Sequence, residues 1–254
     1  MPELEIRGLS RSFGGLKAVN AVTFTVQPGL IKSVIGPNGA GKTTLFNLVS
    51  GMLSVDSGFI FHNSREITGL QPHRIAELGI SRTFQTTRLF SRMTVLENVM
   101  VGRHSRTRAG FFSSILNLPW TWREEREIRE RSMELLDSLG LADAAEELAS
   151  NLPFGKQRLL EIARALATEP SLLLLDEPAA GLNIYETREM ADLVLKIRGW
   201  GITILLVEHD MSLVMDISDE IVVLNYGEKV AEGQPAVIQR DPEVIRIYLG
   251  GEHA

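Results

Sequence analysis

Residues 36–43 read Gly-Pro-Asn-Gly-Ala-Gly-Lys-Thr, which fills every fixed position of the pattern G-x-x-x-x-G-K-[ST]. An apolar, β-branched run, Ile31–Ile35, precedes this stretch, and the residues from Thr44 to Val49 can continue it as a helix. Strand, glycine-rich loop and helix in this order are the context in which the pattern binds phosphate. The glycines allow backbone N–H groups and the helix N-terminus to converge on phosphate oxygens. The stretch therefore predicts a nucleotide-binding loop in an α/β fold.

Two side chains of the loop are suited to nucleotide chemistry. Lys42 supplies a point charge for the β- and γ-phosphates, and the Thr43 hydroxyl can bind Mg²⁺. The expected ligands are therefore a nucleoside triphosphate and Mg²⁺. The residues that we expect to bind the nucleotide here are Gly36, Pro37, Asn38, Gly39, Ala40, Gly41, Lys42, Thr43 and Thr44.

The composition is that of an ordinary globular protein, with 254 residues, 44% apolar and 23% charged. A net charge of −6 argues against nucleic acid as a main partner, because no global positive field would neutralise phosphates. The absence of cysteine excludes disulfides and thiolate metal sites. The sequence has no signal-peptide pattern at its start and no apolar run of about 18 residues, so we expect a cytoplasmic protein that touches a membrane only through partners.

The chain has three stretches of different character. Short strands dominate the N-terminal part, and a second strand-rich patch runs from Gly51 to Ile67. From about Val95 to Asn151 the residues favour helix. Strands and helices then alternate, and continuously apolar strands indicate a parallel sheet covered on both faces. We therefore expect a helical subdomain, residues 95–158, inserted between the two parts of an α/β core, residues 1–94 and 159–254. Expected strands are Leu4–Arg7, Val22–Val26, Ile31–Ile35, Leu172–Leu175 and Ile202–Val207; expected helices are Arg123–Leu139, Leu159–Ala167 and Ile184–Arg198.

Polar residues follow two of the apolar strands. Asp176 and Glu177 come directly after Leu172–Leu175, at the edge where an open α/β sheet places ligand chemistry. Asp176 is suited to hold Mg²⁺ and Glu177 to polarise an attacking water. The alternative for Asp-Glu-Pro is a polar turn, but the phosphate loop favours the functional interpretation.

Two further polar residues are weaker candidates. His209 follows the strand Ile202–Val207 and can reach a γ-phosphate as a donor, although a lone histidine is more often a surface or core residue. Gln85 could bind Mg²⁺ or the attacking water through its amide, but by itself it is only a polar loop residue.

Taken together, these motifs resemble the ATP-binding subunits of ABC transporters. After the phosphate loop, that family has a Q-loop glutamine, a signature region, an acidic strand end, a D-loop and a switch histidine. The resemblance runs nearly end to end, from Leu4 to Gly250. In the order of the family, the motifs here are residues 36–43, Gln85, Leu152–Gln157, Asp176–Glu177, Ala180–Asn183 and His209.

The resemblance implies one ABC ATPase domain over residues 1–254. Its fold would be a RecA-like P-loop NTPase core with an N-terminal antiparallel β subdomain and an inserted α-helical subdomain that carries the signature. It implies ATP and Mg²⁺ as cofactors and an aromatic residue that stacks on adenine, here Phe13; the alternative that Phe13 is a core aromatic stays open. The implied metal ligands are Thr43, Gln85 and Asp176, and the implied catalytic residues are Glu177, His209 and Gln85.

The signature region departs from the common family pattern Leu-Ser-Gly-Gly-Gln. Pro153 replaces the serine, Phe154 the first glycine and Lys156 the glutamine, while Gly155 remains and Gln157 follows. Proline has neither a hydroxyl nor an N–H, so one donor to a partner's γ-phosphate is missing, at a loss of about 1.5–3 kcal/mol. The charge of Lys156 is a candidate compensation. The D-loop likewise ends in asparagine, at residue 183, where aspartate is common.

These departures are similar to those of one branch, the LivG-type ATPases of branched-chain amino acid importers. Residues 152–158 read Leu-Pro-Phe-Gly-Lys-Gln-Arg, residues 179–183 Ala-Ala-Gly-Leu-Asn and residues 207–211 Val-Glu-His-Asp-Met. The C-terminal run from Asp241 to Gly250 also resembles that branch. Related urea or amide importers share much of this pattern, so they remain an alternative.

The resemblance also implies partners. ATP would hold two ATPase subunits head to tail, with each phosphate loop facing the other subunit's signature. The second ATPase would be a LivF-like paralogue, joined by two transmembrane permeases and, indirectly, a periplasmic or extracellular binding protein. The chain would then lie on the cytoplasmic face of the membrane and bind no nucleic acid. A non-transport ABC ATPase and a nucleotide-dependent switch or kinase are the alternatives; His209 and the signature count against the kinase.

Residues 102–131 hold seven arginines against four glutamates in an otherwise acidic chain. An aromatic and apolar stretch, Phe111–Trp122, lies between the basic residues. This pattern suits docking on a membrane surface or a transmembrane partner. The favoured alternative is that the apolar residues form the core of the helical subdomain.

Overall fold

A computed structural model of the chain describes residues 1–83, 89–104 and 119–249; residues 84–88, 105–118 and 250–254 lie outside the described part. The chain forms two compact units. The first comprises Met1–Arg82 and Ser171–Ala254, and the second Thr83–Pro170. The subdomain boundaries expected from the sequence, at 94/95 and 158/159, stay a prediction.

The first unit holds an antiparallel sheet in the order β2-β1-β4-β5. Side chains alternate between buried and exposed along the first half of β1, as a sheet with one covered face requires. The strand-rich patch expected from Gly51 is shorter than predicted, because residues 51–56 form turns and loop before β4 begins. The strands are β1 (Leu4–Phe13), β2 (Leu16–Val26), β4 (Ser57–His62) and β5 (Arg65–Glu66).

A second sheet of this unit has the order β10-β9-β3-β8-β7-β6. All neighbouring pairs are parallel except β9 and β10. Every residue of β3, β7 and β8 is buried, so the predicted parallel sheet covered on both faces is confirmed. Because β8 lies between β3 and β7, the loops after these three strands meet at one edge of the sheet. The strands are β3 (Ile31–Ile35), β6 (Ile80–Arg82), β7 (Leu172–Asp176), β8 (Thr203–Val207), β9 (Glu220–Asn225) and β10 (Glu228–Gly233).

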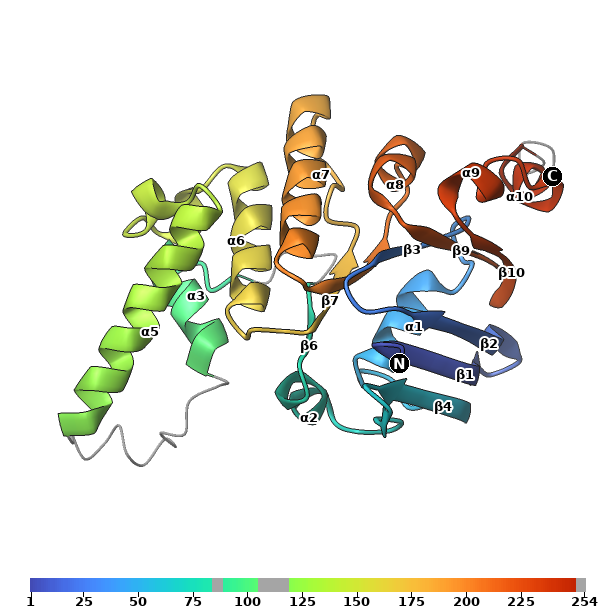
Figure 1. The fold of residues 1–254 in the computed structure, drawn as a ribbon, viewed down its shortest axis with the longest axis horizontal. Coiled ribbons are helices and arrows are strands. Elements are labelled where there is room, and N and C mark those ends of the chain that lie inside the picture. Colours follow the sequence, from blue (N-terminus) through green and yellow to red (C-terminus); the bar gives the residue numbers. More distant parts are fainter. Residues whose placement is uncertain (84–88, 105–118, 250–254) are drawn as a thin grey trace. The chain divides into compact units, whose positions relative to one another are not determined.

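Helices cover the two faces of this second sheet. Val222 and Leu224 of β9 belong to a core shared with α1 and the antiparallel sheet, whereas Ile221 and Val223 pack with α8 and α9. Figure 1 shows α1 between the two sheets of this unit and α7 and α8 on the other side of the second sheet. The helices are α1 (Lys42–Val49), α2 (Pro72–Glu77), α7 (Ile184–Gly199), α8 (Met211–Ile217), α9 (Pro235–Ile238) and α10 (Pro242–Leu249).

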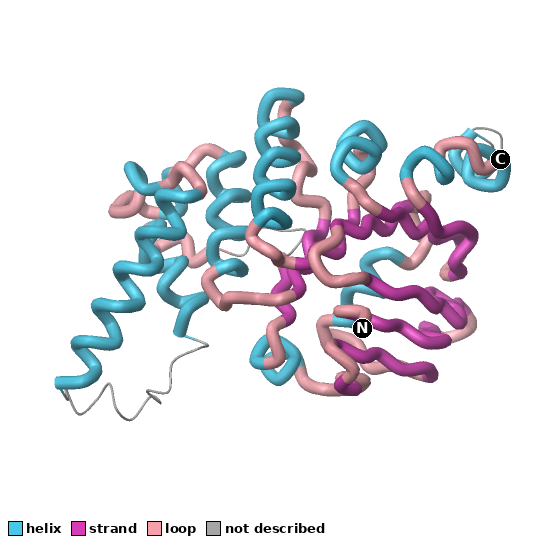
Figure 2. Tube along the Cα trace, in the orientation of Figure 1, coloured by secondary structure: helices cyan, strands magenta, loops and turns pink. Residues whose placement is uncertain are grey.

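The second unit is helical, as expected. Its helices are α3 (Val95–His104), α5 (Pro119–Ser138) and α6 (Phe154–Leu166), with two 3-10 turns at Ala142–Ala144 and Ala149–Asn151. Helix α3 contacts both α5 and α6, and Figure 2 shows the three helices in cyan. Ile128 and Leu136 of α5 are buried, which fits the apolar side predicted for this helix. Across the described ranges, no helix is long and apolar enough to cross a membrane.

Candidate nucleotide-binding site

The loop at 36–43 follows β3 directly and leads into α1. Gly36 and Gly41 have φ angles of +150° and +101°, in the region that side chains rarely adopt. A Cβ atom at Gly36 would lie 2.1 Å from the carbonyl oxygen of Leu224, and one at Gly41 would lie 2.3 Å from that of Ala18. The glycines are therefore needed both for the curl of the loop and for its close packing on β9 and β2.

Backbone donors gather where the loop becomes a helix. Helix α1 begins at Lys42 with Gly41 as its N-cap, and no side chain caps it. Among the described residues, the N–H groups of Gly39, Gly41, Lys42 and Thr43 have no hydrogen-bond acceptor. Such N–H groups, together with the positive end of the helix dipole, form an anion site. Asn38, Gly39 and Thr43 are exposed, so this site is open to a ligand.

The Lys42 side chain is hydrogen-bonded to the start of its own loop. Its Nζ donates to the carbonyl oxygens of Gly36 at 2.7 Å and Pro37 at 3.0 Å, and the residue is 5% exposed. Burial lowers the pKa of Lys42, and the negative charges of Glu177 and Asp176 partly oppose that effect. The ammonium group therefore belongs to the same charge cluster as the two predicted acidic residues.

Asp176 is the last residue of β7 and is 1% exposed. Nη2 of Arg82, the last residue of the neighbouring strand β6, donates to Oδ2 of Asp176 at 2.8 Å. Nη1 of the same arginine donates to Asn47 Oδ1 at 2.7 Å and to Ser50 Oγ at 2.8 Å. Arg82 therefore ties the predicted metal ligand to the helix that starts with Lys42 and Thr43. No pattern in the sequence indicated this role of Arg82.

Glu177 and His209 are in direct contact. Glu177 Oε1 lies 2.6 Å from His209 Nε2, and the Glu177 N–H donates to the carbonyl oxygen of Val207 at 2.9 Å. Glu177 is 8% exposed and has a φ of +51°, a conformation of the kind that stores about 1–3 kcal/mol of strain at functional sites. The 44% exposed side chain of His209 leaves the pair accessible. The structure thus brings together the predicted base and the predicted switch histidine.

Glu208 is a polar residue of this edge to which sequence reasoning gave no role. It is 3% exposed, and its carboxylate accepts from the N–H groups of Ala179 at 2.8 Å and His209 at 3.0 Å. Burial raises the pKa of Glu208, and these backbone hydrogen bonds partly offset that effect. Its only sequence signal was its place between an apolar strand and His209.

The donor set fits Mg²⁺ bound together with phosphates. Thr43 offers a hydroxyl and Asp176 a carboxylate, the hard oxygen ligands that Mg²⁺ prefers, and Mg²⁺ commonly takes its remaining ligands from substrate phosphates and water. Within the described ranges, no group of three His, Asp or Glu side chains could hold a metal alone. The third predicted ligand, Gln85, lies outside the described residues.

Phe13 ends β1 and is 46% exposed, so it is not a core aromatic. The Arg11 guanidinium lies 5.1 Å from the centroid of its ring, which leaves Phe13 as an exposed ring supported by a cation. Its stacking on adenine stays a prediction.

The signature region lies in the second unit, at the start of α6. Pro153 is the N-cap residue and supplies no side-chain hydrogen bond, while Phe154 is 47% exposed. Lys156 is exposed, Gly155 is half-buried, and Gln157 Nε2 donates to the carbonyl oxygen of Leu152 at 2.9 Å. Helix α6 begins at Phe154, five residues before the start at Leu159 expected from the sequence, so its first N–H groups follow Pro153 directly. The predicted trans role of Pro153–Gln157 stays a prediction.

The D-loop, Ala180–Asn183, ends in a helix cap. Asn183 Oδ1 accepts from the N–H groups of Tyr185 at 2.9 Å and Glu186 at 3.1 Å, and Glu186 accepts in return from the Asn183 N–H. This capping box provides a structural role for asparagine at a position where the family often has aspartate.

Residues 102–131 are described only in part. Arg126 pairs with Glu130 and Arg131 with Glu127, which is ordinary charge pairing along an exposed helix. Residues 105–118 and the side chains of residues 119–123 lie outside the described part, so the docking and core interpretations of Phe111–Trp122 both stay open.

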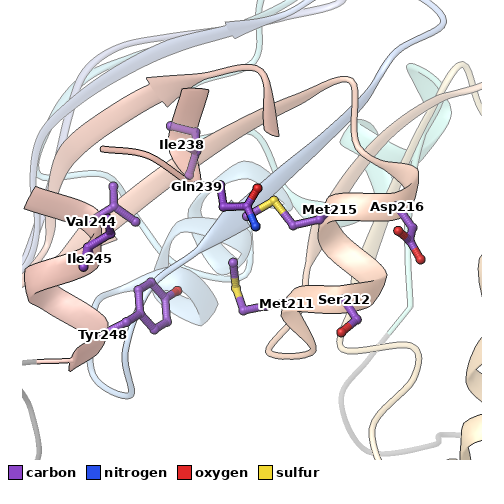
Figure 3. A pocket seen from close by; sticks show the side chains of 9 residues that line it. All are labelled: Met211, Ser212, Met215, Asp216, Ile238, Gln239, Val244, Ile245 and Tyr248. Carbon is purple, nitrogen blue, oxygen red and sulfur yellow. The ribbon is translucent and has the colours of Figure 1, made fainter. Parts of the chain in front are cut away.

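A pocket of about 540 Å³ lies beside α8, α9 and α10. Met211 and Met215 of α8 face Gln239 and Tyr248 across it, as Figure 3 shows. Burial raises the pKa of Tyr248 to about 12, so its hydroxyl stays neutral at physiological pH. Most of its lining is apolar, and none of the predicted site residues lines it.

Comparison with known proteins gives consistent matches. The family described as "ABC transporter" matches residues 19–180, and the family described as "Branched-chain amino acid ATP-binding cassette transporter" matches residues 228–254. The high-affinity branched-chain amino acid transport ATP-binding protein LivG of Escherichia coli (strain K12) is 48% identical over 250 residues, 98% of each chain. BraF of Pseudomonas aeruginosa, described in the same words, is 46% identical over 98% of each chain. A crystal structure of the ADP conformation of an ABC transporter's ATP-binding cassette superposes with a TM-score of 0.86 at 33% identity, over 98% of this chain and 99% of the other.

Proposed function

We propose that this chain, which belongs to the ABC transporter family, is the ATP-hydrolysing subunit of an importer of branched-chain amino acids. The family membership gives ATP binding and hydrolysis coupled to transport. Branched-chain amino acids as the cargo are supported by the printed functions of LivG and BraF and by the C-terminal family match. A urea or amide importer is the alternative cargo class.

The 2.6 Å contact between Glu177 and His209 supports the hydrolytic role most strongly. In the proposed mechanism, the ammonium group of Lys42 and the loop's N–H groups that have no acceptor within the described ranges, those of Gly39, Gly41, Lys42 and Thr43, hold the β- and γ-phosphates of ATP. Glu177 accepts a proton from the attacking water. His209 keeps the carboxylate oriented and lies close enough to donate to the γ-phosphate.

Mg²⁺ would be held by Thr43, Asp176 and Gln85 and would neutralise the charge that develops on the phosphates. Arg82 fixes the orientation of the Asp176 carboxylate through Oδ2. The exposed ring of Phe13 is available to stack on the adenine base.

The site would be completed by a second ATPase subunit, a LivF-like paralogue, bound head to tail. Two exposed apolar residues directly after the D-loop support an interface here: Ile184 is 84% and Tyr185 83% exposed. In return, this chain would present Pro153–Gln157, with its exposed Phe154 and Lys156, to the partner's ATP. Two transmembrane permeases would hold the pair on the cytoplasmic face of the membrane and receive cargo from a periplasmic or extracellular binding protein.

Co-purification and transport test this proposal. We expect the tagged chain to co-purify with a second ATPase and two multi-span membrane proteins. When these are placed in liposomes with their binding protein, ATP should drive uptake of labelled leucine, isoleucine and valine. Uptake of urea in place of leucine would support the alternative cargo. ATP consumption by the isolated chain in proportion to an added phosphate acceptor would identify a kinase and overturn the proposal.

A further inference from the structure

The Glu208 carboxylate closes a ring of contacts around the proposed base. Its Oε1 accepts from the Ala179 N–H at 2.8 Å, and its Oε2 accepts from the His209 N–H at 3.0 Å. Ala179 follows Glu177 by two residues, and the His209 ring returns to Glu177 Oε1 at 2.6 Å. The loop after β7 and the loop after β8 are therefore joined by two side-chain contacts, one through Glu208 and one through the pair itself, in addition to the backbone hydrogen bond from the Glu177 N–H to the Val207 carbonyl oxygen.

The hydrogen bonds at this position suit a carboxylate. Both oxygens face N–H donors, and a glutamine would place its own NH₂ group against one of them. A buried carboxylate is expensive unless hydrogen bonds satisfy it, and Glu208 is 3% exposed. A residue serving only as a strand terminus would not need this arrangement, because Val207 already pairs with Asp176 through the sheet.

The two contacts differ in exposure. The Ala179 and Glu208 groups are buried, whereas the side chain of His209 is 44% exposed. The contact between His209 and Glu177 is accordingly accessible to an arriving nucleotide or partner, whereas the Glu208 contact is shielded from both.

We propose that Glu208 is a positioning residue for hydrolysis: its buried carboxylate holds the loop after Glu177 and the backbone of His209 together and so sets the contact between base and histidine. This inference rests on the proposed function, in which Glu177 is the base. Glu208 touches neither the phosphates nor the water in this scheme and acts through the other two residues.

The test compares Glu208→Gln with the wild type in the assembled transporter. We expect kcat for ATP to fall about 10- to 100-fold, while the Kd for ATP changes less than about threefold, because the phosphate loop is untouched. A double variant, Glu208→Gln with His209→Ala, should be no slower than His209→Ala alone, because both act through one contact. Glu3→Gln is the matched control, a buried carboxylate directly before β1, and should keep wild-type kcat.

Each outcome bears on the inference. Wild-type kcat in Glu208→Gln overturns it, as does a loss that multiplies with that of His209→Ala or that comes with an equal loss of ATP affinity. If Glu208→Gln does not fold, Glu208→Asp, which keeps the charge on a shorter side chain, should show a smaller fall in kcat at unchanged Kd; wild-type kcat there overturns the inference. Glu177→Gln is run in parallel: if it hydrolyses ATP normally, the proposed base has failed, whereas if it alone is inactive, only the role of Glu208 has failed.

Discussion

The edge of the parallel sheet and the start of α6 differ in how their polar groups are held. At the sheet edge, Lys42, Asp176 and Glu177 are at most 8% exposed, and each side chain has a hydrogen-bond partner within the site. At the start of α6, Phe154 is 47% exposed and Pro153 supplies no cap. The side chains of the first region are therefore held in place without a ligand, whereas Phe154 of the second region is exposed to solvent. This difference is what we expect if one region hydrolyses ATP and the other completes a site on a different subunit.

Among these predictions, we expect the largest effect from removing Arg82, which should lower the free energy of unfolding of the first region. In Arg82→Leu, the buried carboxylate of Asp176 loses its 2.8 Å partner, and loss of one member of a buried pair costs about 3–5 kcal/mol. Denaturant unfolding measures this. Arg74→Leu is the matched control, because its pair with Glu77 is exposed, and it should change stability by less than about 1 kcal/mol. Equal effects of the two changes would show that Arg82 does not hold the site together.

Lys42→Ala should act on nucleotide binding. Removing a charge-assisted interaction with the phosphates weakens binding by about 1.5–3 kcal/mol, or roughly 10- to 150-fold in Kd. Titration with labelled ATP at physiological salt measures this, with Lys196→Ala, an exposed lysine of α7, as the control. Tight ATP binding by Lys42→Ala would contradict the assignment of residues 36–43 as the phosphate-binding loop.

These first two predictions also mark what the sequence could and could not reveal. The phosphate loop, Asp176, Glu177 and His209 could be placed because parallel strands bring their carboxyl ends to one edge. Arg82 could not be placed, because its role depends on β6 pairing with β7, residues that lie about 90 positions apart in the chain. Glu208 was missed for a similar reason: its partner Ala179 lies on another loop.

Pro153→Ser tests the second region, the start of α6. Serine restores a hydroxyl at the N-cap of α6 and a donor toward the partner's γ-phosphate, so we expect hydrolysis at that site to rise by up to about tenfold. Single-turnover hydrolysis in the assembled transporter measures this, and Pro153→Ala, which restores only the N–H, serves as the control. Unchanged or lower activity would mean that proline is adapted to this partner.

The smallest expected effect is at Asp56, which lies outside both regions and is hydrogen-bonded to β1. The N–H of Ser12 and the guanidinium of Arg11 hold the pKa of Asp56 below its usual value of about 3.9. Because the folded pKa is lowered, the stabilisation is present above pH 4 and is lost as the pH falls through the folded value. The difference in Tm between wild type and Asp56→Asn, at most about 2 °C, should therefore shrink below pH 4. A difference that stays constant to pH 2.5 would contradict this assignment.

The central claim is that Glu177 is the base of a site that only a second subunit completes. Glu177→Gln mixed with the partner ATPase and Mg-ATP tests it directly, by analytical ultracentrifugation together with phosphate release. We predict ATP binding near wild-type affinity, a fall in turnover of about 10²- to 10⁴-fold, and a stable dimer with ATP but not with ADP. Normal phosphate release by Glu177→Gln as a monomer would contradict the claim.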